Sequence, residues 1–173
     1  MRYRFFALFG VLVLASVAPG LASAQGKWRD FSSPEGGFSV SLPGKPSLTQ
    51  SVHKSFVGAV KESTYTAKSG GVTYSASYSE LPGIAVTLGG SHTIFNKAKD
   101  GLLKEAGGSE NAFDAISLGK IEGRELSFTL NGGGSGRARF FLVDKRLYVI
   151  VASGRASAAA AMIKFLNSFK LLS

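Results

Sequence analysis

Hydrophobic and polar residues alternate over several short segments of the chain, which is the pattern of β-strands. The alternation predicts strands at residues 38–42, 48–54, 60–67, 72–79, 113–118, 124–130, 138–143 and 147–152. In strand 72–79 every second residue is apolar and the other four carry hydroxyls, which is typical of a sheet with one covered and one wetter face. Strands 138–143 and 147–152 are apolar on both faces, so we expect them in the middle of a covered sheet.

Two segments follow the helical period instead. An apolar stripe from Ile94 to Ala106 predicts a helix that starts at Ser91 or Thr93 and stops at Gly107. A second stripe, from Ala158 to Phe169, predicts a C-terminal helix. Because the connections between strands are mostly short hairpins, the sheet should be largely antiparallel. The pattern therefore predicts an α+β domain in which helices cover an antiparallel sheet.

The first segment of the chain has the three parts of a secretory signal. Arg2 and Arg4 precede an apolar run at residues 5–17, and small residues lead up to Ala24. As a helix the apolar run would be about 20 Å long, too short for a hydrocarbon core of about 30 Å. We expect cleavage between Ala24 and Gln25, which gives a signal peptide at 1–24, one domain at 25–173, and a periplasmic or secreted location. An uncleaved membrane anchor is the alternative.

Composition and charge narrow the chemistry. The 173 residues include no cysteine, which excludes disulfide scaffolds, thiol nucleophiles, and zinc or iron–sulfur sites held by cysteine. The net charge is +9, and removal of the signal would lower it by two. The excess is spread along the chain, with a mild concentration that includes Arg124, Arg137, Arg139 and Arg146.

These four arginines are a candidate patch for an anion or a partner, and an ordinary solvated surface is the alternative. An exported protein seldom meets nucleic acid. The expected partner is therefore an acidic protein or an anionic component of the envelope.

Four segments resemble bacterial PsbP-like domains: residues 28–46, 74–82, 123–125 and 165–171. The matching positions are turn glycines, prolines and core aromatics. The resemblance implies an α/β/α sandwich, with helices on both faces of a largely antiparallel sheet. Extrinsic photosystem II subunits and a Ran-binding import factor of eukaryotes share this fold, and their activities are unrelated. The resemblance therefore supplies no site residue for this chain.

Candidate catalytic residues are sparse. His53 and His92 have no carboxylate or second histidine at a metal-ligand spacing. The two Ser-x-x-Lys tetrads, Ser51–Lys54 and Ser117–Lys120, fall in or beside predicted strands, where residues three apart face opposite sides. The glycine-rich loop 132–136 precedes a strand and not a helix, unlike a phosphate loop. We expect no catalytic constellation, no cofactor and no metal.

The sequence as a whole favours an exported, non-enzymatic binding or accessory module. The alternative is a small hydrolase or ligand-binding enzyme whose site is assembled from dispersed residues, with His53, His92 and the glycine-rich loop as contributors. A further alternative is an extrinsic photosynthetic subunit.

Overall fold

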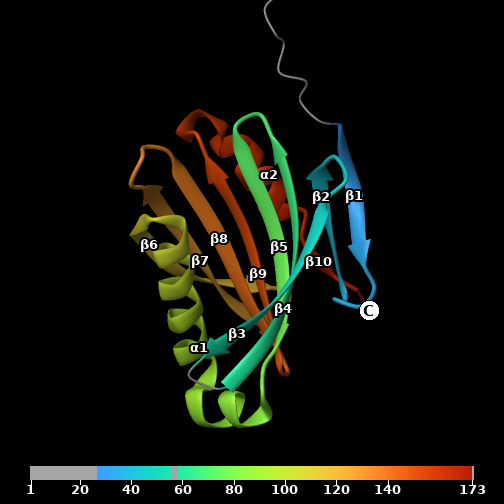
Figure 1. Cartoon of the computed structure of the whole chain (residues 1–173), viewed down its shortest axis with the longest axis vertical. Helices are drawn as coiled ribbons and strands as arrows, with labels where there is room; N and C mark the ends of the chain where they lie inside the picture. Colours follow the sequence, from blue (N-terminus) through green and yellow to red (C-terminus); the bar gives the residue numbers. More distant parts are fainter. Residues whose placement is uncertain (1–26, 56–57, 173) are drawn as a thin grey trace, which may run out of the picture.

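A seven-stranded antiparallel sheet dominates the molecule (Figure 1). The computed structural model describes residues 27–55 and 58–172. The strand order in the sheet is β3-β4-β5-β9-β8-β7-β6, and every neighbouring pair is antiparallel. The strands are β3 (Ser47–Ser55), β4 (Gly58–Ser69), β5 (Val72–Glu80), β6 (Gly108–Leu118), β7 (Ile121–Leu130), β8 (Ser135–Val143) and β9 (Arg146–Gly154). The α+β class and the mostly antiparallel sheet are confirmed.

A second, three-stranded sheet was not predicted. It has the order β1-β2-β10 and joins β1 (Trp28–Ser33), β2 (Phe38–Pro43) and β10 (Lys170–Leu171). The C-terminal helix was expected to reach Phe169, but it ends at Asn167, and the extended chain that follows pairs with β2. The error has a physical reason: helical spacing of apolar residues does not reveal a pairing between opposite ends of the chain.

The two helices are α1 (Gly83–Ala106) and α2 (Ala159–Asn167), and a 3₁₀ turn (Ala156–Ala158) leads into α2. Gly90 interrupts α1 with φ 62° and ψ 164°. The part after this kink begins at Ser91, where the sequence predicts a helix start. The C-terminal stop is confirmed: Gly107 is left-handed, and its N–H donates to the carbonyl of Leu103.

Strand β9 separates two hydrophobic clusters. Tyr148, Ile150 and Ala152 belong to the first cluster, which also contains α2, β2 and the inward face of β5. Leu147 belongs to the second, which contains α1 and parts of β7 and β8, and Val149 and Val151 pack against it. The prediction that β9 is central and apolar on both faces is confirmed.

The small sheet and α1 lie on opposite sides of the large sheet (Figure 1). One cover of the large sheet is therefore formed partly by strands, whereas the sequence predicts helices alone. The proposed signal, with its cleavage site at Ala24 and Gln25, lies outside the described residues. Within the described ranges, no helix is long and apolar enough to cross a membrane.

Candidate functional site

Two of the four predicted patch arginines lie together on β8. Arg137 and Arg139 share one face of the strand, as their spacing predicts. Both donate to the carboxylate of Glu125 on β7, at 2.7 and 2.6 Å. Arg139 also donates to the carbonyl of Leu166 at 3.2 Å and to the side-chain oxygen of Asn167 at 2.8 Å. Arg139 therefore holds the C-terminal end of α2, and Glu125 offsets part of the charge of the pair.

The other two arginines lie elsewhere. Arg124 precedes Glu125 on β7, so its side chain projects from the opposite face of the sheet. Arg146, at the start of β9, donates to Glu80 at 2.5 Å and to the carbonyl of Gly36 at 3.0 Å. Its guanidinium lies 5.3 Å from the ring centre of Tyr78. The four arginines do not form one continuous patch.

A cavity of about 270 Å³ lies beside α2, and we call it the Trp28–Tyr74 pocket. Its residues come from β1, the end of β2, the β4–β5 hairpin, β5, the segment that leads into α2, and the first turn of α2. The lining residues are Trp28, Pro43, Ser69, Gly70, Val72, Tyr74, Arg155, Ser157, Ala158, Ala160 and Ala161.

Aromatic contacts fix the wall of this pocket. The rings of Trp28 and Tyr74 meet edge to face, with centres 5.4 Å apart. Tyr74 also meets Phe165 of α2 edge to face, at 5.3 Å. The ammonium of Lys164 lies 4.6 Å from the ring centre of Trp28, a favourable cation–π contact. These contacts hold β1, β5 and α2 in one arrangement.

Arg155 lies over the hairpin that closes one side of the pocket. Gly70 and Gly71 have φ of 59° and 74°, the left-handed pair that a two-residue hairpin turn requires. A Cβ at Gly71 would be 3.4 Å from Nε of Arg155, an ordinary van der Waals contact, so the guanidinium lies directly against this turn. Among the described residues, Arg155 forms no ion pair.

The hydroxyl of Tyr74 opens into the pocket. Tyr74 is only 2% exposed, and its hydroxyl forms no hydrogen bond with the part of the chain that the structure describes. Within that part, every fully shielded polar side-chain atom has a partner. The small exposed area of Tyr74 must therefore include its hydroxyl, and the pocket is the cavity that Tyr74 lines. Burial raises the pKa of this hydroxyl, so it is protonated at neutral pH and available as a donor.

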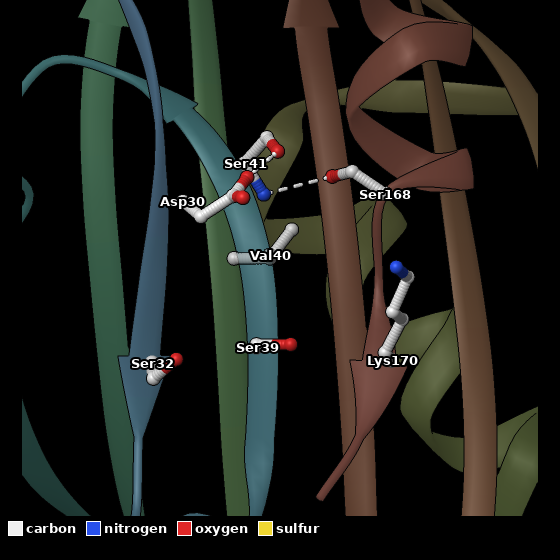
Figure 2. A pocket seen from close by; sticks show the side chains of 7 residues that line it. All are labelled: Asp30, Ser32, Ser39, Val40, Ser41, Ser168 and Lys170. Atoms are coloured by element: carbon white, nitrogen blue, oxygen red, sulfur yellow. Dashed lines mark hydrogen bonds between the residues drawn. The ribbon is translucent and has the colours of Figure 1, made fainter.

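A smaller, polar cavity of about 230 Å³ lies on the outer side of the small sheet (Figure 2). Three of its polar residues, Asp30, Ser41 and Ser168, belong to one hydrogen-bond network. The Ser168 hydroxyl accepts from the Ser41 amide at 2.9 Å and donates to the carbonyl of Phe165 at 2.6 Å. The Ser41 hydroxyl in turn donates to the carboxylate of Asp30. This network ties the end of α2 to β2, so its role is structural.

The structure does not bring the other candidate residues together. His92 is exposed on α1 and its ring bonds to Asn96, at 3.1 Å, while the side chain of His53 lies outside the described residues. Ser117 ends up in β6 and Lys120 in the turn after it. The glycine-rich loop is shorter than predicted, because Ser135 and Gly136 already belong to β8. Among the described residues, no cluster of histidine and acidic side chains fits a metal.

The sequence pattern does not predict the Trp28–Tyr74 pocket. Tyr74 was interpreted as one member of an apolar stripe. The sequence feature that could have indicated the pocket is its hydroxyl, because a buried tyrosine hydroxyl usually has a hydrogen-bond partner. Arg155 belongs to the mild concentration of basic residues in the sequence, but only tertiary structure places it beside Gly70 and Gly71.

Comparison with known proteins gives a match in structure alone. No family model matches the sequence, and a search of curated proteins gives no match. The solution structure of cyanobacterial PsbP (CyanoP) from Synechocystis sp. PCC 6803 superposes with a TM-score of 0.58. The match covers 91% of this chain and 98% of that one, at 12% sequence identity. The chain therefore has a PsbP-like fold, as its turn and core residues led us to expect.

Proposed function

We propose that the protein is an exported binding module of the periplasm or cell envelope, without catalytic activity of its own. The observation that carries the proposal is the Trp28–Tyr74 pocket, which combines a cation, hydroxyls and apolar walls. A cavity that places a charged group and hydroxyls beside apolar side chains is typical of ligand recognition. We further propose that residues 25–173 form one domain with helices on both faces of its sheet.

Export is tested by fractionation of the source cells and N-terminal sequencing of the recovered protein. The predicted signal at residues 1–24 supports a mature protein that begins at Gln25 in the periplasmic or secreted fraction. Recovery of a chain that begins at Met1 in the cytoplasm would overturn this part of the proposal.

Binding is tested by capture from an envelope extract with the tagged protein as bait. Mass spectrometry across a salt series should identify one component enriched over a bait of similar charge and unrelated fold. Charge contributes to such association at low salt and is screened as salt rises. Equal recovery on both baits would contradict a specific binding function.

We propose the anion patch in a narrower form, centred on Arg137. This side chain is 39% exposed, against 23% for Arg139, which is also engaged with α2. We expect Arg137→Glu to weaken retention of an anionic partner at low salt, compared with Lys120→Glu, the same charge reversal in an exposed turn. Equal retention by the two variants would show that the sheet face around Arg137 does not bind the anionic partner.

A second candidate is an accessory photosynthetic subunit, and the observation behind it is the likeness to cyanobacterial PsbP. This candidate expects photosystem II subunits among the captured proteins. Capture of other envelope components in their place would decide against it.

A further inference from the structure

We propose that the Trp28–Tyr74 pocket binds a carboxylate that carries one small apolar group. The inference rests on the proposed binding function and names its ligand class. Two sources share this chemistry: a free carboxylic acid and the C-terminal residue of a peptide.

The negative charge is recognised by Arg155. A guanidinium offers two parallel N–H donors that match the two oxygens of a carboxylate. Arg155 has no acidic partner among the described residues, whereas Arg137, Arg139 and Arg146 each have one. Its cation is therefore available to a ligand without the rupture of an ion pair.

Tyr74 supplies the second recognition element. Its hydroxyl is protonated at neutral pH, opens into the pocket, and has no partner within the described chain. A donor that is otherwise desolvated gains more from a charged acceptor than an exposed donor does. Ser157 also lines the pocket, at the turn that leads into α2. Neither this turn nor α2 has a side-chain cap at its N-terminus, and the helix end favours negative charge.

The walls select the rest of the ligand. The apolar lining residues are Trp28, Pro43 and Val72, together with three alanines of the segment 158–161. The cavity of about 270 Å³ is smaller than the roughly 300 Å³ at which drug-sized sites begin. A phenyl or short branched alkyl group fits this space.

These walls also favour a carboxylate over a phosphate. Only one cationic side chain, Arg155, is among the lining residues, and no lysine is. A phosphate dianion would remain half neutralised by this single cation, which is costly in a partly desolvated site. A monoanion with an apolar body matches both the single charge and the walls.

The test measures binding of 3-phenylpropanoate to the purified protein by calorimetry and by NMR. The control ligand is the uncharged amide, 3-phenylpropanamide, which has nearly the same shape and no negative charge. We expect the acid to bind and to shift the Trp28 indole and Gly70–Gly71 amide signals, and the amide to bind at least about tenfold more weakly. Equal affinities for acid and amide would overturn the proposal.

Variants locate the site. Arg155→Gln should weaken acid binding about tenfold or more, and Tyr74→Phe several-fold, because each removes a donor to a charged acceptor. Lys120→Gln removes one positive charge from an exposed turn and should bind as the unmodified protein does. Circular dichroism verifies that each variant is folded. Unchanged binding by folded Arg155→Gln would overturn the assignment.

A tripeptide ending in Phe, with a free or an amidated C-terminus, distinguishes the two sources. Tighter binding of the free-ended peptide than of 3-phenylpropanoate supports a protein C-terminus as ligand. The reverse order supports a small acid. If no acid or free-ended peptide binds, the carboxylate proposal is wrong, while envelope capture still tests the binding function separately.

Discussion

At the scale of single residues, Gly136 shows how a missing side chain shapes the core. Gly136 pairs with Phe128 across β7 and β8, and a Cβ on it would be 2.1 Å from the Phe128 ring. Phe128 is fully buried in the cluster beneath α1. The ring therefore occupies the space that any larger residue at position 136 would need.

We expect Gly136→Ala to lower the free energy of unfolding by about 1–3 kcal/mol, because it overpacks a filled core. Urea denaturation measures the change. Gly132→Ala is the control, since a Cβ there has open space. It should leave stability unchanged or raise it by up to about 1 kcal/mol. Equal effects of the two substitutions would show that the contact with Phe128 is unimportant.

Tyr74 gives a pH dependence with a definite sign. Its pKa is higher in the folded than in the unfolded chain, because burial penalises the phenolate. The folded protein then keeps the proton longer than the unfolded chain does. Stability should be unaffected below the ordinary tyrosine pKa of about 10 and should fall as the pH rises from there to the raised value.

Urea denaturation across this alkaline range, for the unmodified protein and Tyr74→Phe, measures the effect. The Tyr74→Phe variant lacks the group and should lose less stability than the unmodified protein. Parallel losses in both proteins would assign the pH dependence to other groups.

At the scale of elements, α2 is held at its C-terminal end by β8. Arg139 binds the carbonyl of Leu166 and the side chain of Asn167, and it pairs with Glu125. A cation at a helix C-terminus satisfies free carbonyls and complements the helix dipole. A residue first considered for partner binding thus joins a helix to the sheet.

Arg139→Ala should lower the free energy of unfolding by about 1.5–3 kcal/mol, the usual range for hydrogen bonds to charged groups. Arg139→Lys should restore only part of the loss, because one ammonium cannot reproduce the planar fork. Arg137→Ala is the comparison and should cost less, since it removes the contact to Glu125 alone. Chemical denaturation that finds equal losses for Arg137→Ala and Arg139→Ala would contradict this role.

At the scale of the whole molecule, the two sheets share one core. Phe38 and Val40 of β2 belong to the same buried cluster as Tyr74 and Ile150 of the large sheet. Neither sheet can expose its inner face without exposing that of the other. We therefore expect the described chain to unfold as one cooperative unit.

Trp28, the only tryptophan, lies in the small sheet, so its fluorescence reports that sheet. Far-ultraviolet circular dichroism reports mainly the seven-stranded sheet. In urea the two signals should give the same midpoint and slope. An earlier fluorescence transition would show that the small sheet unfolds independently.

The local pattern of apolar and polar residues was sufficient to predict much of this fold. The stripe of Val72, Tyr74, Ala76 and Tyr78 is buried as expected, and the helix stops at Gly107. The pattern did not predict elements whose structure depends on contacts with segments far away in the sequence. The pattern does not predict the helical segment 83–89 before the Gly90 kink, and it does not predict the strand β10 after α2. Whether Arg137 and Arg139 contact Glu125 depends on pairing, which their spacing alone does not give.

The sequence by itself determined which residues alternate, where strands turn, where the second part of α1 begins and ends, and that the fold is PsbP-like. Periodicity fixes the face of an element on which a residue lies, and glycine or proline fixes where an element stops. Tertiary structure decided which faces meet. The pairing of β5 with β9 places Arg155 beside the β4–β5 hairpin, and the packing of β1 and α2 against β5 brings Trp28 to Tyr74. Contacts between residues so far apart depend on how the whole core is filled, which no local pattern encodes.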